Sequence, residues 1–324
     1  MSKIQNNTCV IIASHISNQY RIPYLKDCLL SLVNQTISPS IHLSISFETE
    51  EYRNIVIKTL HDTPDLYNYG ELFIYVREQK TTQMQHIELL CNEISIHNYD
   101  WIMFCDDDDT YEPMRVERFH HYISKQIENS TIDKCQIGLY ESTFGKNHRE
   151  HRHEYWCYCI SFKILKQFFD RLNNATTNTD IINHTCCDIM FANYLRRLND
   201  DYLFIAINEN LYNYHIHEDS NSITGHIQKT QSTVRCPNPP DIGDITFADY
   251  IVDWNTYLYD NLHLYLHDTY LRTIVGTNFD DILKAEFKAD YPHIKFIDEC
   301  HIKQLKELYE YLCDVCNKVY DIGL

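Results

Sequence analysis

One acidic segment constrains the fold of this chain more than any other: residues 101–119 read WIMFCDDDDTYEPMRVERF. An apolar run typical of a buried strand leads directly into four carboxylates, Asp106, Asp107, Asp108 and Asp109. Such neighbours repel one another and are poor strand and helix formers, so a nearby cation, usually a hard metal ion, would stabilise them. A solvated acidic loop is the simpler alternative. Because ligands of open α/β sheets bind beyond the carboxyl ends of strands, the junction favours a metal site.

Apolar runs alternate with helix-like patterns through the first part of the chain. Strands are expected at 8–14, 41–48, 71–76 and 101–105, and helices at 24–35, after residue 48 and at 81–94. This alternation predicts an α/β fold, a mostly parallel sheet with helices on both faces. The acidic run then lies at the end of the fourth strand.

The rest of the chain is less regular. Helices are expected at 114–125, 162–172 and 187–198, and strands at 135–140, 155–161 and 202–207. A Pro-rich stretch without periodicity, RCPNPPDIGD, predicts a linker. We therefore expect one domain over 1–230, a linker over 231–244 and a helical region over 245–324. An apolar stripe that includes Leu305 and Leu312 is typical of a core or a subunit contact, which makes these helices a candidate homodimer surface.

Charge and cysteine content exclude some classes of function. The net charge of −18 argues against binding to nucleic acid or to an anionic membrane. The 13 cysteines are irregularly spaced, and neither a signal-peptide pattern nor a membrane-spanning run is evident, so we expect reduced thiols and a cytoplasmic protein. Frequent Ile, Asn, Tyr and Asp suggest an A/T-rich genome, that of a large virus or a microbe.

Four segments in order carry a resemblance to a known family. They read VIIASHISNQYRIPYLKDCLLSLVNQT, FCDDDDTYEPMRVERF, CCDIMFANYLRRL and NLYNYHIHEDSNS. Together they resemble the family 2 glycosyltransferases over roughly the first two-thirds of the chain. The resemblance implies the GT-A fold, a Rossmann-like sheet, here with a C-terminal helical extension. It also implies metal-dependent, inverting transfer of a sugar from a nucleoside-diphosphate sugar to a hydroxyl of a glycan or glycoconjugate.

The resemblance assigns roles to the acidic residues. Asp108 is expected to bind Mn²⁺ or Mg²⁺ directly, and Asp106 to contact ribose or metal-bound water. Asp107 near the nucleotide and Asp109 near the acceptor are expected to support them or to be merely solvated. Asp188 occupies the position of the catalytic base; the alternative is an Asp that complements the dipole at a helix start. The family usually has Glu just before this Asp, where this chain has Cys187.

Other residues are expected around the nucleotide sugar, with UDP favoured over GDP as its carrier. These are Ala13, His15 and Asn18 after the first strand, Glu48 after the second, and Gln83 and His86 in the helix before the acidic strand. Glu48 replaces the family's Asp and keeps an acceptor with a longer reach. The alternative is that these are ordinary solvent-facing residues.

Histidines complete the predicted site. His215 and His217 fall on one side of an extended segment, His217 as a metal or diphosphate contact and His215 near the acceptor. A partly buried histidine with satisfied hydrogen bonds is the alternative. The basic stretch KNHREHRHEYW, with His153 and Trp156, is either a lid whose Trp stacks on a sugar or an ordinary exposed loop.

Two other functions remain open on the sequence. A nucleotidyltransferase would share the nucleotide-binding layout, but it would be expected to carry a Gly-rich phosphate loop, and ASHISNQYR has no glycine. A catalytically degenerate member would bind a nucleotide sugar or act as a scaffold. The absence of the family's DDGS motif and the Cys at position 187 keep this alternative open.

Overall fold

The computed structural model describes residues 7–93, 98–129, 131–142, 154–198, 202–215, 247–286 and 299–320. The chain forms two compact units, residues 1–215 and residues 216–324. The expected linker at 231–244 lies outside the described residues, so the proposed domain limits stay predictions.

A seven-stranded sheet forms the centre of the first unit, in the order β3-β2-β1-β4-β7-β6-β8. Strands β1 (Thr8–Ile16), β2 (Ser40–Phe47), β3 (Leu72–Val76) and β4 (Trp101–Asp106) are parallel. β6 (Ile137–Glu141) and β8 (Leu203–Ile207) are parallel to each other, whereas β7 (Tyr158–Ser161) is antiparallel to β4 and β6. The predicted mostly parallel α/β sheet is confirmed, and it is consistent with the GT-A fold.

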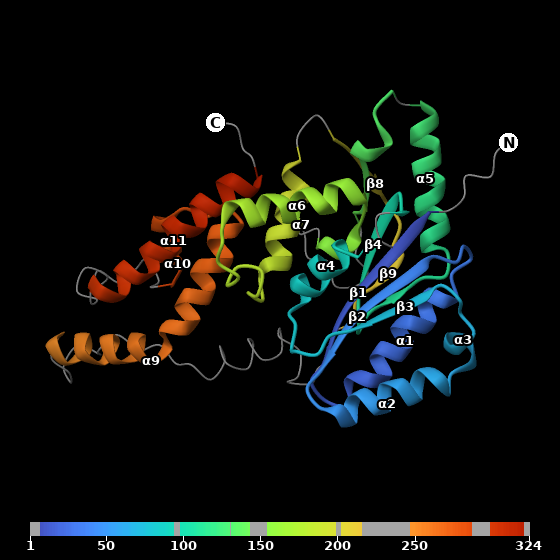
Figure 1. Ribbon diagram of the computed structural model, residues 1–324. Helices are drawn as coiled ribbons and strands as arrows, with labels where there is room; N and C mark the ends of the chain where they lie inside the picture. Colours follow the sequence, from blue (N-terminus) through green and yellow to red (C-terminus); the bar gives the residue numbers. More distant parts are fainter. Residues whose placement is uncertain are drawn as a thin grey trace. The chain divides into compact units, whose positions relative to one another are not determined.

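Helices cover both faces of this sheet (Figure 1). One face carries α1 (Arg21–Val33), α2 (Glu50–His61) and α3 (Pro64–Tyr67), which pack on one another. The other carries α4 (Gln83–Cys91), α6 (Phe162–Ala175) and α7 (Cys187–Arg197). α5 (Arg115–Asn129) packs against β6. α1 shows why these segments are helical, because its buried side chains recur at helical spacing: Ile22, Leu25, Cys28, Leu29 and Leu32.

Two local features differ from the expectation. The strand predicted at 155–161 is a strand only as β7, because η3 (Tyr155–Cys157) forms a 3₁₀ turn before it. The carbonyl oxygen of Trp156 in that turn accepts a hydrogen bond from the Arg115 guanidinium at 3.0 Å instead of a strand partner. A small antiparallel sheet, β5 (Thr110–Tyr111) with β9 (Tyr212–Asn213), was not predicted.

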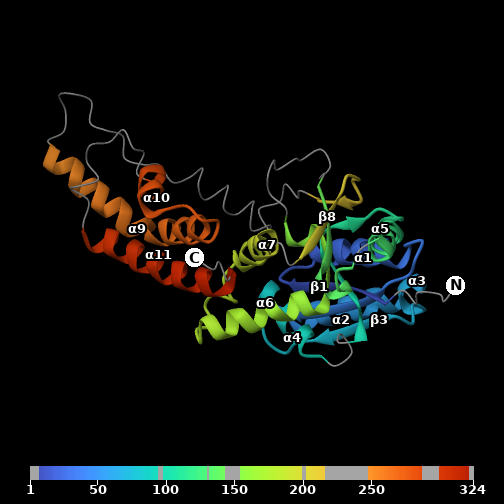
Figure 2. The same cartoon turned by 90° about the horizontal axis from the view of Figure 1, so that it is seen from above.

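The described part of the second unit is helical, as the sequence predicts. Its helices are α9 (Phe247–Ile274), α10 (Phe279–Glu286) and α11 (Glu299–Tyr320), and α11 packs along α9 (Figure 2). The Tyr320 hydroxyl donates to the carbonyl of Ile274 at 2.9 Å, which ties the ends of these two helices together. Gly276, with φ of 97°, allows the turn between α9 and α10. No helix among the described residues has the length and apolarity needed to span a membrane.

Candidate functional site

The four carboxylates Asp106–Asp109, which we call the acid turn, begin at the last residue of β4. The Asp109 backbone N–H closes the turn on the Asp106 carbonyl at 3.2 Å. Asp106 pairs in register with Ala13 of the neighbouring strand β1. The acid turn therefore lies at the carboxyl end of the parallel strands, where open α/β sheets bind ligands.

Asp106 belongs to a three-residue network on the α4 side of the sheet. One of its carboxylate oxygens, Oδ1, accepts hydrogen bonds from the Gln83 amide at 2.9 Å and from the Tyr155 hydroxyl. The Gln83 amide also donates to the Tyr155 hydroxyl at 2.9 Å. Because both donors bind the same oxygen, they fix the orientation of this carboxylate.

Asp107 is held from the opposite side. Its Oδ2 accepts from the Ser14 hydroxyl of β1 at 2.5 Å, and its Oδ1 accepts from the Arg21 guanidinium of α1 at 2.6 Å. The same guanidinium nitrogen lies 3.8 Å from the Asp108 carboxylate. Asp107 is 7% exposed and Asp108 is 23% exposed, so of these two consecutive side chains Asp108 is the more accessible to a ligand.

Asp109 is buried and connects the acid turn to the segment around β9. Its carboxylate accepts from the Tyr212 hydroxyl at 2.8 Å and from the His215 backbone N–H at 2.8 Å. The Tyr212 hydroxyl in turn accepts from the Asp106 backbone N–H at 3.0 Å. Asp109 was expected to lie near the acceptor, but its side chain is fully buried and its oxygens accept hydrogen bonds from protein groups.

Burial and mutual repulsion favour neutralisation of the carboxylate charges in the acid turn. Burial, and then the charges of Asp109 and Asp108, raise the pKa of Asp106 well above its ordinary value. Burial, and then Asp108, raise the pKa of Asp109 to about 8, although the His215 and Tyr212 hydrogen bonds oppose this shift. Crowded carboxylates raise one another's pKa because like charges in a low dielectric repel.

A buried ion pair lies under this network. The Arg115 guanidinium donates to Glu141 at 2.6 Å, and both side chains are fully buried. The guanidinium also lies 4.1 Å from the ring centre of Tyr111 and 4.9 Å from that of Tyr212. Arg115 thus fastens α5 to β6 and supports the tyrosine whose hydroxyl bonds both ends of the acid turn.

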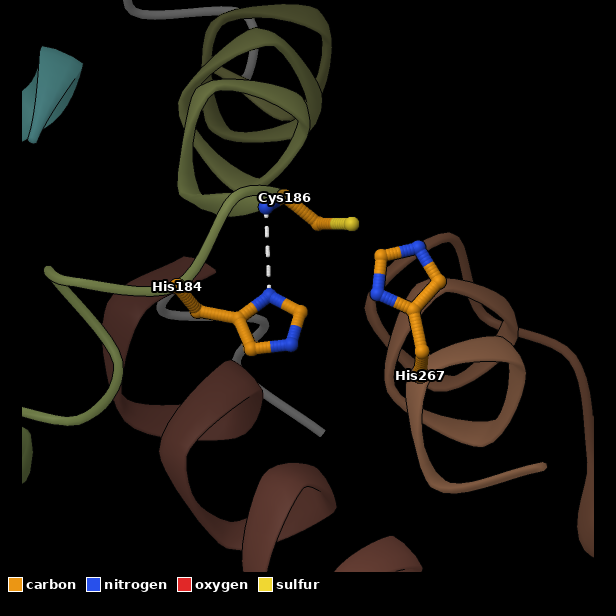
Figure 3. A group of neighbouring side chains, drawn as sticks. All are labelled: His184, Cys186 and His267. Carbon is orange, nitrogen blue, oxygen red and sulfur yellow. Dashed lines mark hydrogen bonds between the residues drawn. The ribbon is translucent and has the colours of Figure 1, made fainter. Parts of the chain in front are cut away.

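Asp188 lies in the first turn of α7. Its charge raises the pKa of Tyr155, after burial and the charge of Asp106, so the Tyr155 hydroxyl is within the electrostatic influence of both carboxylates. Just before the helix, the Cys186 backbone N–H donates to Nδ1 of His184 at 3.1 Å (Figure 3). This turn fixes where α7 begins and therefore where Asp188 lies. His267, also drawn in Figure 3, belongs to α9 of the second unit.

A polar group lies at the ends of β1 and β2, where nucleotide contacts are expected from the sequence. His15 bonds Ser46 through Nδ1 at 2.9 Å and Glu48 through Nε2 at 3.1 Å. The Lys80 ammonium lies 3.6 Å from Glu48. The His15 hydrogen bond, and then the Lys80 charge, lower the pKa of Glu48. Glu48 is half exposed, so it is an ionised acceptor available to a ligand.

Two other expected nucleotide contacts have different surroundings. His86 is buried, with Nδ1 bonded to Ser44 at 2.8 Å and Nε2 to Ser46 at 3.1 Å. Because both ring nitrogens of this α4 residue bond serines of β2, the buried His86 ring is not placed to contact a nucleotide. Asn18 is partly exposed, and its side-chain oxygen accepts from the Tyr20 backbone N–H at 3.0 Å, which shapes the turn before α1.

The expected lid and histidine contacts are only partly described. His153 and His217 lie outside the described residues. Trp156 is buried and stacks on Tyr212, with ring centres 4.1 Å apart, so its stacking partners are protein tyrosines and it offers little surface to a sugar. His215 is exposed and bonds the Thr110 hydroxyl through Nε2 at 3.0 Å.

The acid turn fits a hard divalent cation. Its side chains offer carboxylate oxygens, the ligands that Mg²⁺ and Mn²⁺ prefer. Both oxygens of Asp107 already accept hydrogen bonds, and Asp109 is buried in its own. Asp108, with Oδ2 of Asp106, would therefore be the pair to hold such an ion, and metal binding by these residues stays a prediction.

Sequence reasoning missed four residues that organise the site. These are Ser14, Arg21, Tyr155 and Tyr212. Tyr155 and Tyr212 are among many tyrosines and had no distinguishing spacing. Arg21 lies before the helix expected at 24–35; only the observed start of α1 at Arg21 places this cation in a first turn, where it opposes the helix dipole and calls for a nearby anion.

No protein-family model and no curated protein matches the chain. Among solved structures, the chain is similar to TarS of S. aureus at 12% identity and a TM-score of 0.46, covering 97% of this chain and 55% of TarS. It is similar to the TarS fragment 1-349 at 11% identity and a TM-score of 0.47, covering 97% and 90%. It is also similar to the same fragment in complex with UDP, at 11% identity and a TM-score of 0.45, covering 97% of this chain and 90% of the fragment. The chain therefore spans about half the length of the longer TarS structure.

Proposed function

We propose that this chain is a metal-dependent glycosyltransferase that moves a sugar from a nucleoside-diphosphate sugar to an acceptor hydroxyl with inversion. The observation that carries the proposal is the connection between the two acidic groups of the site. The Asp106 carboxylate of the acid turn accepts a hydrogen bond from the Tyr155 hydroxyl, and the charge of Asp188 also raises the pKa of that tyrosine. One buried hydroxyl is thus coupled to a carboxylate of the acid turn and, electrostatically, to the candidate base.

On the donor side, His15, Glu48 and Lys80 provide polar groups for the nucleoside. Glu48 accepts N–H groups of a base or hydroxyls of a ribose. Mn²⁺ or Mg²⁺ on Asp108 and Asp106 would offset the negative charge that develops on the leaving diphosphate. UDP is favoured over GDP as the carrier on the family resemblance alone.

On the acceptor side, the attacking hydroxyl must lose a proton as it reaches the anomeric carbon. Asp188 is the carboxylate that we assign as general base. Attack on the face opposite the leaving diphosphate inverts the configuration in a single displacement. The acceptor is proposed to be a glycan or glycoconjugate.

Replacement of the base separates catalysis from binding. We expect Asp188→Asn to lower kcat by about 10²–10⁴-fold, because the amide cannot take the proton. Donor binding should change little, since Asp188 does not belong to the acid turn. Steady-state kinetics with a titration of the donor nucleotide distinguish the two effects; a normal kcat would remove Asp188 from the mechanism.

Thermal unfolding with UDP, GDP and Mn²⁺ tests the binding half of the proposal. A nucleotide diphosphate that binds the native state should raise Tm only when Mn²⁺ is present. Asp108→Asn should abolish that shift, whereas Asp62→Asn, on an exposed residue after α2, should retain it. Stabilisation that ignores both the metal and Asp108 would contradict the proposed site. Binding without turnover would identify the degenerate alternative.

A further inference from the structure

Arg21 is an unusual residue to find at the first position of α1. The positive end of a helix dipole lies at its N-terminus, so a cation there is unfavourable by about 0.3–1 kcal/mol. The first turn of α1 has no acidic residue that would compensate. The reason for Arg21 therefore lies outside the helix.

That reason is the acid turn. One guanidinium nitrogen of Arg21 lies 2.6 Å from Asp107 and 3.8 Å from Asp108. The charge of Asp107 is the main cause of the raised pKa of Arg21, and Asp108 adds to it. Nε of Arg21 is buried and has no hydrogen-bond partner, so the acid contacts are made from the end of the side chain.

The contacts divide the acid turn between two sides. Arg21 and Ser14 hold both oxygens of Asp107 on the α1 side, whereas Gln83 and Tyr155 hold Asp106 on the α4 side. On the other side of Asp108, the Tyr212 hydroxyl and the His215 backbone N–H hold the Asp109 carboxylate. Because protein groups hold both sequence neighbours of Asp108, the backbone around it has little freedom. The Asp108 side chain is 23% exposed, against 7% for Asp107, and its carboxylate lies 3.8 Å from the Arg21 guanidinium.

We infer that Arg21 is a positioning residue, which fixes Asp107 and through it presents Asp108 for divalent-cation binding. The inference rests on the proposed function in one respect, that the acid turn binds a cation. It adds a residue that acts through another and does not itself contact the ion.

The direction in which Arg21→Met changes the affinity for Mn²⁺ distinguishes a positioning role from a purely electrostatic effect of the Arg21 charge. If Arg21 acted only by its charge, Arg21→Met would remove a repelling cation 3.8 Å from Asp108 and would tighten Mn²⁺ binding. If Arg21 positions the turn, the same substitution weakens binding, because a residue that orients a ligand commonly contributes about 10–100-fold to metal affinity.

The test is a titration of the full chain with Mn²⁺, in which free Mn²⁺ is followed by electron paramagnetic resonance. We expect Arg21→Met and Asp107→Asn each to weaken binding by about 10–100-fold, and the double variant to be no weaker than the worse single variant. Arg21→Lys, which keeps a charge and a donor, should recover part of the affinity. Arg53→Met, which removes an exposed arginine of α2, is the matched control and should bind like the wild type.

The outcomes are separable. Tighter or unchanged binding in Arg21→Met, with normal binding in the wild type, overturns the inference and leaves the proposed function intact. Additive losses in the double variant overturn it as well, because independent residues would add. No Mn²⁺ binding by the wild type rejects the metal site and the inference together. Thermal unfolding of each variant shows that the titrated protein is folded, and Asp107→Asn supplies the test if Arg21→Met is not.

Discussion

At the level of single residues, the four carboxylates of the acid turn have the same chemistry and different surroundings. Asp107 and Asp109 are buried and hold structural donors, Ser14 and Arg21 for the first and Tyr212 for the second. Of the consecutive pair Asp107 and Asp108, Asp108 has the more exposed side chain, 23% against 7%. The surroundings thus favour a supporting role for Asp107 and Asp109 and leave Asp108, with Asp106, as the proposed cation ligands.

Tyr155 offers a prediction at this scale. Tyr155→Phe removes one of two donors to Oδ1 of Asp106 and keeps the ring that packs 5.4 Å from Phe104. We expect a loss of about 10–100-fold in kcat/KM, because the carboxylate is no longer fixed. Kinetics at saturating Mn²⁺ check it, with Tyr158→Phe, another buried tyrosine, as the control. Equal kinetics in Tyr155→Phe and wild type would show that the hydroxyl is dispensable.

His86 gives a prediction about pH. Burial, and then the charge of Arg77, lower the pKa of His86 from 6.5 to about 3. Between pH 6.5 and about pH 3, His86 is therefore protonated in the unfolded chain and neutral in the native state. The free energy of unfolding should fall as the pH decreases below 6.5. The loss is about 1 kcal/mol per pH unit from this group.

Urea unfolding of wild type and His86→Gln between pH 7 and pH 4 isolates this effect. Glutamine can still bond the two serines and does not titrate, so its stability should depend less on pH than that of the wild type. The difference between the two proteins cancels the opposite slope expected from the raised pKa of Asp106 and Asp109. Parallel pH profiles would show that His86 is not the group responsible.

At the level of elements, the junction of α5, β6 and η3 supports the site. Arg115 binds Glu141 on β6 and the Trp156 carbonyl in η3. The side chains of Arg115 and Glu141 have no exposure to solvent. Such a pair stabilises little compared with apolar replacements, but breaking it leaves a charge buried without its partner. The junction is therefore sensitive to loss of either partner alone.

Arg115→Met tests the junction. We expect a loss of about 3–5 kcal/mol in the free energy of unfolding, because Glu141 remains buried and charged. The double variant Arg115→Met/Glu141→Leu should recover a large part of this loss. Urea unfolding measures both, with Arg118→Met, whose partner Glu209 is partly exposed, as the milder control. A double variant less stable than Arg115→Met would contradict the account.

The sequence predicts most elements of the first unit because strand and helix signals are local. For example, apolar runs suffice to predict β1 and β4, and a periodic apolar face suffices to predict α1. The small β5–β9 sheet could not be predicted, because it pairs two residues of each strand across about a hundred positions. The acid turn was predicted from its charge, whereas Tyr155 and Tyr212 reach it only through tertiary packing.

At the level of the whole molecule, the chain combines an α/β unit that contains every described residue of the acid turn network with a helical unit, residues 216–324. A homodimer through the C-terminal helices stays a prediction, which light scattering with size-exclusion chromatography would test. With a net charge of −18, a phosphorylated donor would approach against repulsion, so the proposed cation at the acid turn would aid association as well as chemistry.

Release of nucleotide from a panel of UDP-, GDP-, CMP- and dTDP-sugars, by the purified full chain with Mn²⁺, tests directly whether this chain transfers sugars. We expect release from one donor, its loss in Asp108→Asn, and its retention in Asp62→Asn. No release from any donor, together with no metal-dependent binding of nucleotide, would contradict the assignment as a glycosyltransferase.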